Sequence, residues 1–166
     1  MLKLASLAGA AAALVAAAPA TAHDHGKAKN KAKTATCAAI PPNAVDTLFN
    51  QWNAAWATGN PDTVANLFAR DAVLLPTVSA VPRTDRAGIR DYFVGFLRNA
   101  PVGQIDSSTV IEGCNKLIRM GQWSVGFTDA ATRAQSRVSG RYTFIYTYED
   151  GAWKVAHLHS SLNPAT

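Results

Sequence analysis

The sequence predicts an α+β domain, with helices in the first half of the folded part and antiparallel strands in the second. Two patterns lead to this prediction. Between residues 43 and 99, apolar side chains recur every three or four positions, as on the buried face of an amphipathic helix. From Ile105 to the end, β-branched and aromatic residues gather in short runs separated by turn residues. Helices followed by strands, without regular alternation of the two, are typical of the α+β class.

Three helices are predicted. The first covers about residues 43–58, because Asn43 can cap its start and Gly59 can end it. The second is short and begins at Asn60-Pro61, a capping residue followed by a proline in the first helical position. The third covers about residues 85–99 and carries an apolar stripe along one side.

Six strand-like runs are also present. Arg70-Asp71 is interpreted as a turn that leads into the first of them. Glu149-Asp150-Gly151 is interpreted as the hairpin turn before the last, because Asp-Gly favours the tight turns that join antiparallel strands. The runs cover residues 72–81, 108–114, 116–121, 122–134, 137–149 and 152–162.

Residues 1–22 have the features of a signal peptide. Lys3 precedes an alanine-rich apolar run, and Ala20-Thr21-Ala22 fits the A-x-A cleavage pattern. A membrane anchor is the alternative, but the apolar run is shorter than the ~20 residues that a spanning helix needs. We therefore expect export to the periplasm or the outside, a mature chain that begins at His23, and no membrane span.

The formal net charge of +5 is concentrated outside the predicted domain. From Cys37 onward, the chain has 11 basic and 10 acidic side chains. Residues 23–42 are rich in lysine and alanine and cannot bury an apolar face, so we predict a mobile basic lead before a domain at residues 43–166. A nucleic-acid interface would instead build its basic stripe into the fold. Nucleic acid is therefore not expected as a partner.

Cys37 and Cys114 are the two cysteines of the chain. In an oxidising compartment an even pair is a disulfide candidate. A bond between them would tie the lead to the sheet and stabilise the fold by about 4 kcal/mol. Two separately buried thiols are the alternative, because the sequence does not give the distance between the Cα atoms.

Three stretches resemble the nuclear-transport-factor-2-like (SnoaL-like) superfamily of cone-shaped α+β domains. WNAAWATGNPDTVANLFARDAVLLP resembles its first two helices and first strand, DRAGIRDYFVGFL its third helix, and YTFIYTYEDGAWKVAHLHSS its final hairpin. The closing W-x-x-x-H-x-H-x-S pattern is most similar to the association (hub) domain of calcium/calmodulin-dependent protein kinase II, which secreted bacterial relatives carry without a kinase. The resemblance implies three N-terminal helices packed in a strongly bent antiparallel or mixed sheet.

The resemblance also implies a pocket inside the cone and an outer sheet face that joins copies into a homodimer or larger ring. Because side chains alternate between the faces of a strand, the match places Tyr142, Phe144 and Tyr146 inside, with Leu158 and Ser160. Phe144 and Ser160 stand where the hub domain has arginines suited to a carboxylate. The expected ligand is therefore a small apolar molecule held by aromatic surface and a few hydroxyls.

Other residues could complete this pocket. Trp52 and Trp56, four residues apart on the first helix, could form one wall, or they could belong to the core. Arg119, Arg137 or Arg141 could supply a guanidinium in place of the missing arginines. The sequence has neither a glycine-rich phosphate loop nor a kinase catalytic loop, so ATP and calmodulin are not expected as partners, and no cofactor is expected.

The last predicted strand contains two catalytic candidates, His157 and His159, which point to the same face. One role is a general base, because the histidine pKa lies near neutral. A second role is a pair of metal ligands. The favoured interpretation is a pair of hydrogen-bonded groups at a dimer face or pocket rim. Asp71 is a further candidate base, or it ends the preceding helix turn.

Cleavage after Ala22 would leave His23-Asp24-His25 at the new terminus. The free amine, two deprotonated amides and the imidazole of His25 can surround Cu(II) or Ni(II) with a square of four nitrogens. His23 and His25 are therefore candidate metal ligands. A coincidental histidine in a flexible tail is the alternative.

These observations favour an exported, non-catalytic, oligomer-forming module with an internal, largely aromatic small-molecule pocket. The alternative is a small-molecule enzyme of the isomerase, dehydratase or polyketide-modifying type, because related cone folds abstract protons with an Asp or His beside a tyrosine. The enzyme hypothesis predicts a titratable group deep in the cone with a strongly shifted pKa.

Overall fold

The helices precede most of the sheet along the chain, as the sequence predicts. The computed structural model describes residues 36–164, so the predicted signal peptide and the candidate ligands His23 and His25 lie outside the described residues. No helix within residues 36–164 is long and apolar enough to cross a membrane. The elements in chain order are α1 (Ala44–Ala57), α2 (Pro61–Ala65), β1 (Phe68–Leu75), α3 (Arg86–Phe96), a 3₁₀ turn (Leu97–Asn99), β2 (Val102–Ile105), β3 (Thr109–Gly113), β4 (Lys116–Thr128), β5 (Gln135–Glu149) and β6 (Ala152–Leu162).

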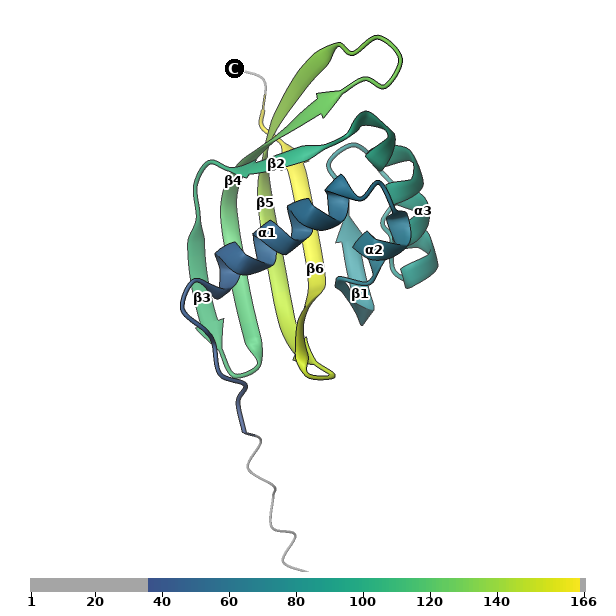
Figure 1. The fold of residues 1–166 in the computed structure, drawn as a ribbon. Coiled ribbons are helices and arrows are strands. Elements are labelled where there is room, and N and C mark those ends of the chain that lie inside the picture. Colours follow the sequence, from purple (N-terminus) through teal and green to yellow (C-terminus); the bar gives the residue numbers. More distant parts are fainter. Residues whose placement is uncertain (1–35, 165–166) are drawn as a thin grey trace, which may run out of the picture. The chain divides into compact units, whose positions relative to one another are not determined.

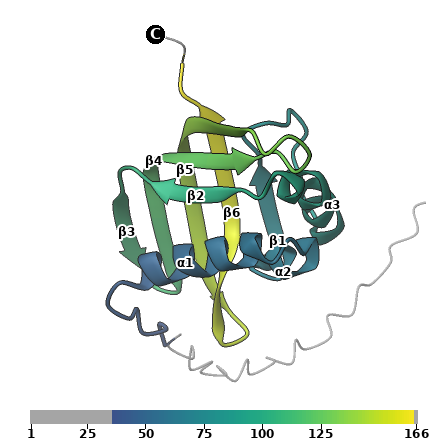
Figure 2. The ribbon, with the colours of Figure 1, turned by 45° about the horizontal axis from the view of Figure 1, so that its top comes forward.

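The strands form one mixed sheet in the order β1-β6-β5-β4-β2, and β3 also pairs with β4. β1 runs parallel to β6, and the other pairs are antiparallel. Helix α1 crosses one face of this sheet, whereas α2 and α3 lie near β1 (Figure 1). Figure 2 shows β2 running across the direction of β6, because the sheet bends strongly between them. This arrangement confirms the predicted α+β cone.

Two glycines allow backbone segments to approach closely where the long strands bend. A Cβ atom on Gly121 of β4 would collide with the carbonyl oxygen of Ser107. A Cβ atom on Gly140 of β5 would lie 2.5 Å from the carbonyl oxygen of Ser161. A side chain at either position would therefore push a neighbouring segment away from the strand.

Several local predictions are confirmed. The last strand has the predicted bounds, and α1 differs from its predicted range by one residue at each end. The side chain of Asn60 caps α2 by accepting a hydrogen bond from the Asp62 N–H, at 2.9 Å. Asp150 and Gly151 both have positive φ, as a tight hairpin turn of this kind requires.

The predicted start and end of the first strand are wrong. Arg70-Asp71 is not a turn, because β1 begins at Phe68 and runs through both residues, with an irregular pairing to β6 before Val73. The strand ends at Leu75, and Pro76 follows it. Proline has no N–H to donate to a sheet, which is why the apolar run does not continue as a strand.

Two other predictions about the elements are wrong, and one strand was not predicted. The predicted strands 116–121 and 122–134 are one strand, β4, because Gly121 bends the strand without ending it. β4 ends at Thr128, and residues 129–134 form the turn before β5. β2 was not predicted, since Gly103 interrupts its short apolar pattern. Asn43 precedes α1 in a left-handed conformation, and its side chain makes no capping hydrogen bond.

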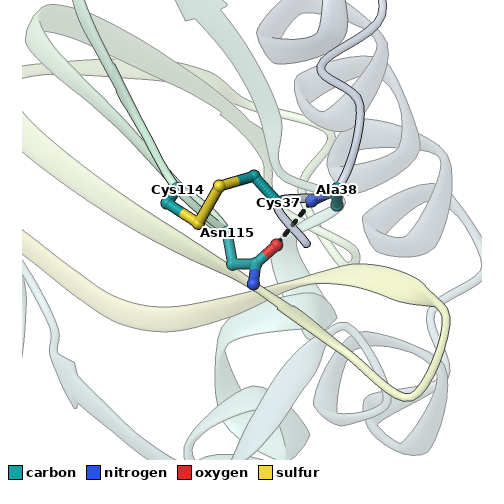
Figure 3. Close-up of a disulfide and its surroundings, with 4 residues drawn as sticks. All are labelled: Cys37, Ala38, Cys114 and Asn115. Atoms are coloured by element: carbon teal, nitrogen blue, oxygen red, sulfur yellow. Dashed lines mark hydrogen bonds between the residues drawn. A yellow bond between two sulfur atoms is a disulfide. The ribbon is translucent and has the colours of Figure 1, made fainter. Parts of the chain in front are cut away.

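Cys37 and Cys114 form a disulfide, which confirms the predicted pairing and excludes two separate thiols (Figure 3). Their Cα atoms are 4.9 Å apart, within the range that a disulfide spans. Beside the bond, the Ala38 N–H donates a hydrogen bond of 2.7 Å to Asn115 Oδ1. These two contacts hold the segment before α1 against the turn between β3 and β4.

Aromatic rings fill most of the space between the helices and the sheet. Trp52 of α1 lies edge-on to Phe68, Phe93 and Phe144, with ring centroids 5.6, 5.8 and 5.2 Å away. Edge-to-face pairs of this kind contribute about 0.5–1.5 kcal/mol each beyond the burial of their area. The cone interior is therefore a packed core with little free volume.

Candidate functional site: an aromatic cavity inside the bent sheet

A small cavity remains where α1 and α3 face the bent part of the sheet. Its volume is about 30 Å³, which is room for about two water molecules. Its walls are mainly aromatic and aliphatic, and no acidic, basic or histidine side chain is among the described residues that line it. The aromatic rings of the wall belong to Trp52, Trp56, Tyr92, Phe93, Phe96, Trp123 and Phe127.

Hydroxyl groups supply the polar part of the wall, and Ser160 of β6 is central to them. Its Oγ accepts a hydrogen bond from Trp123 Nε1 at 2.9 Å and another from Thr77 Oγ1 at 2.5 Å. Thr77 belongs to the loop after β1, and Trp123 belongs to β4. One serine therefore joins three segments around the cavity.

The predicted ligand-binding residues divide into two groups. Trp52, Trp56, Leu158 and Ser160 line the cavity. Tyr142, Phe144 and Tyr146 also face inward and are buried, but they pack within the core and do not line the cavity. Phe144 stacks on Tyr146 with their ring centroids 5.5 Å apart. The Tyr142 hydroxyl donates a hydrogen bond of 3.1 Å to the carbonyl oxygen of Ser107.

Several cavity residues were not among the predicted site residues. Tyr92, Phe93 and Phe96 lie on α3, and Trp123 and Phe127 lie on β4. The apolar stripe of the third helix does contain the α3 rings, so the sequence shows that they face inward. It does not show that they end beside free space.

The cavity borders a larger open groove at the mouth of the cone. The two share Val78, Tyr92, Phe96 and Phe127 in their walls. The groove adds charged and polar side chains, which are Arg83, Asp91, Asn99 and Asp129. An apolar interior thus meets a polar mouth.

Burial raises the pKa of two tyrosines well above the usual range. For Tyr92, at the boundary between cavity and groove, desolvation is the main cause and the nearby Arg83 charge opposes it. For Tyr146 in the core, desolvation is again the main cause, and the charge of Arg119 opposes it. Both tyrosines therefore remain neutral phenols around neutral pH.

His157 and His159 lie on the outer face of the sheet, away from the cavity. Pairing across the strands places each histidine in a row of side chains. We call these two rows the outer-face rows. The first is Ile111, Ile118, Ile145, His157 and Val73, and the second is Thr109, Met120, Thr143, His159 and Leu75.

The environment of His157 favours its neutral form. Burial is the first cause that lowers its pKa, and repulsion from His159 is the second. The two rings are therefore close enough to interact. No group of three or more metal-ligating side chains occurs within residues 36–164, so the described chain adds no third ligand to this pair.

Arg119 is a buried guanidinium under α1, with its side chain 6% exposed. It forms an ion pair of 2.9 Å with Asp46 and donates hydrogen bonds to the Val45 carbonyl oxygen and to Ser108 Oγ. Its Cζ lies 5.7 Å from the ring centroid of Phe49. Arg119 therefore anchors the start of α1 and is not part of the cavity wall.

The remaining sequence candidates are on the surface. Arg137 and Arg141 are exposed, and Arg137 donates a hydrogen bond of 2.9 Å to Gln104. Asp71 is also exposed, on β1. None of the three lines the cavity.

The fold and its aromatic interior define an NTF2-like α+β domain. The family model of the SnoaL-like domain matches residues 49–156, and the chain belongs to this family. A crystal structure assigned as a calcium/calmodulin dependent protein kinase II association domain, from Xanthomonas campestris, is 41% identical. Its TM-score is 0.72, and the match covers 79% of this chain and 96% of that one. The predicted resemblance is confirmed.

More distant structures share the fold alone. An NTF2-like superfamily protein from Salmonella enterica serovar Typhimurium is 12% identical, with a TM-score of 0.63 over 74% of this chain and 90% of that one. A structure assigned as a scytalone dehydratase, from Novosphingobium aromaticivorans, is 13% identical, with a TM-score of 0.65. The match covers 75% of this chain and 85% of that one. No curated protein matches the chain.

Proposed function

We propose that this chain is an exported, non-catalytic, oligomer-forming module that binds a small, largely apolar molecule inside the cone. The observation that carries the proposal is the composition of the cavity wall. Aromatic rings surround it, and acids, bases and histidines are absent from its described walls. Such a wall suits binding through apolar contact and a few oriented hydrogen bonds.

The ligand must be small, or the cavity must open. About 30 Å³ holds roughly two waters and is less than an aromatic ring needs. The loop after β1 is the segment best placed to move, because Val78 lines the cavity although the residue is 60% exposed. Displacement of this loop would join the cavity to the groove, and a single-ring molecule could enter from there.

Self-association is the second part of the proposal. The first outer-face row places Ile118 beside Ile145, with Val73 on the far side of His157, on a half-buried, unpartnered face of the described chain. Ile111 at the edge of this face is 52% exposed. A second copy could cover these side chains, and the similarity to an association domain supports assembly.

The enzyme alternative would depend on Tyr92, a cavity residue with a strongly raised pKa. Proton abstraction needs a base within hydrogen-bond reach of the substrate. The neutral phenol of Tyr92 can donate a hydrogen bond, but it is not a base at neutral pH. His157, His159 and Asp71 lie away from the cavity, so the geometry favours binding over catalysis.

Toluene is a suitable neutral probe for the pocket. Its binding can be measured by saturation-transfer NMR, in which the protein is saturated and the signals of toluene are observed. We expect transfer to toluene, and we expect Val138→Phe to abolish it, because Val138 lines the cavity and the larger ring would fill it. Val110→Phe is the matched control, since Val110 lies on β3 with 40% exposure. Equal transfer in both variants would mean that toluene binds elsewhere, and no transfer to any form would refute the proposed pocket.

A further inference from the structure

Two polar atoms of the cavity-lining residues have no hydrogen-bond partner among the described residues. They are the indole nitrogens of Trp52 and Trp56, and both are buried. An indole N–H can donate a hydrogen bond but cannot accept one. A buried donor without an acceptor is unfavourable, so a molecule that supplies an acceptor gains more here than in a wall whose polar groups are already paired.

The two indoles are close enough to act on one small molecule. Their ring centroids are 5.4 Å apart, and both rings line the same cavity. Trp123 provides a contrast within the same wall. Its indole N–H already donates to Ser160, so it has no donor to offer. Among the three tryptophans of the cavity wall, the unpaired N–H groups are therefore the two on α1.

The mouth of the cone adds a third donor. Arg83 Nε is buried and has no partner within the described chain, and Arg83 Nη1 lies 3.5 Å from Asp91 Oδ2. Asp129 also lines the groove. One guanidinium beside two carboxylates gives the mouth a negative balance, which disfavours an anionic ligand. The donors therefore suit an uncharged oxygen better than a carboxylate.

We propose that the ligand is an uncharged ring compound with a hydrogen-bond-accepting oxygen, such as an aryl ketone, held through the indole N–H groups of Trp52 and Trp56. This inference rests on the proposed pocket and specifies what the pocket selects. The ring lies against the aromatic wall, and the carbonyl oxygen accepts the N–H groups that the protein leaves unpaired. Trp52 and Trp56 are then the specificity-determining residues.

Acetophenone and α-methylstyrene form a matched pair of probes, because a carbonyl oxygen in the first replaces a methylene group in the second. In a purely apolar cavity the alkene binds more tightly, since water solvates it less well. The unpaired indole N–H groups of Trp52 and Trp56 should reverse this order of affinities, because they bind the carbonyl oxygen of acetophenone. We expect acetophenone to bind about fivefold more tightly than α-methylstyrene. Benzoate, which carries a charge, is expected to bind more weakly than acetophenone.

The indole N–H signals in a ¹⁵N-correlated NMR spectrum report the contact directly. The chain has four tryptophans, and single Trp→Phe variants assign their signals. Acetophenone should move the signal of Trp52 or Trp56 downfield, whereas α-methylstyrene should not. The signal of Trp153, which packs against Tyr148 outside the cavity, should stay in place with both probes.

Variants complete the test. Trp56→Phe keeps an aromatic ring and removes the N–H, so the preference for acetophenone should fall several-fold, while Trp153→Phe should leave it unchanged. Because Trp56→Phe could disturb the core, the probe comparison on the unaltered protein stands independently. If both probes bind with the alkene tighter, the acceptor inference is wrong although the pocket exists. If neither binds, the proposed pocket itself fails.

Discussion

The indole N–H of Trp123 donates a hydrogen bond of 2.9 Å to Ser160 Oγ, and this contact connects β4 to β6 across the strand between them. The strand between is β5, where the missing side chain of Gly140 leaves room for the carbonyl oxygen of Ser161 on β6. The Trp123 indole lies beside this close approach, with Nε1 3.6 Å from the position of a Cβ atom at Gly140. The bend of the sheet and the wall of the cavity thus depend on the same few atoms.

Ser160→Ala should lower the free energy of unfolding by about 1–3 kcal/mol, because it leaves the Trp123 N–H buried without an acceptor. Ser160 is 5% exposed, so the indole is shielded from bulk solvent. Urea unfolding followed by tryptophan fluorescence measures the change. Ser161→Ala, at the neighbouring half-buried position, is the control and should change stability by much less. Equal effects of the two substitutions would mean that the indole contact contributes little.

Removal of the disulfide should lower the free energy of unfolding by about 4 kcal/mol, because the bond closes a loop of 77 residues that the unfolded chain would otherwise explore. The paired substitution of Cys37 and Cys114 by serine tests this by urea unfolding. A reducing agent should destabilise the original protein by a similar amount and leave the double variant unchanged. A double variant as stable as the original would show that the bond does not constrain the unfolded chain appreciably.

The helices and the last hairpin could be predicted because their signals are local. The Asn60 cap, the apolar spacing and the Asp150-Gly151 turn act within a few residues, and the structure confirms them, although the predicted cap at Asn43 is wrong. β1 shows where local signals fail. Arg70-Asp71 has the composition of a turn, but pairing with β6, far along the chain, draws both residues into the strand.

The cavity wall could be predicted only in part, for a geometric reason. Alternation along β5 correctly places Tyr142, Phe144 and Tyr146 on the inner face. Whether an inward ring fills the core or borders free space depends on the bend of the sheet and on the rings opposite. Those are tertiary features, which is why the roles of Phe96 and Trp123 could not be read from their own neighbours in the sequence.

The stability of the protein should fall as the pH drops below about 6.5, with His157 as one cause. Its pKa in the folded state is lower than the ordinary value of 6.5, so the unfolded chain binds more protons as the pH falls through this range. The contribution of His157 to the free energy of unfolding is fully present above pH 6.5. It is lost as the pH falls through the pKa that His157 has in the folded state. Urea unfolding at a series of pH values measures it.

His157→Gln should flatten this part of the pH dependence. His159→Gln should reduce the contribution of His157 to this pH dependence by a smaller amount. The substitution removes only the second cause of the lowered His157 pKa, while burial remains. The pKa itself can be followed through the ring-proton NMR signal of His157. A value at or above 6.5 in the folded protein would contradict the predicted direction.

The outer-face rows give the last prediction, on self-association. Ile145 lies between Ile118 and His157 in the first row, near the middle of the proposed interface. Ile145→Asp would bury a carboxylate there, and a two-fold dimer would contain it twice, once from each copy. We expect the dissociation constant of the dimer to rise about a hundredfold or more, as measured by sedimentation velocity. Val102→Asp is the control, because Val102 lies on β2, away from the outer-face rows, with 65% exposure. A protein that is monomeric without any substitution, or an Ile145→Asp variant that dimerises as well as Val102→Asp, would show that copies do not meet through this face.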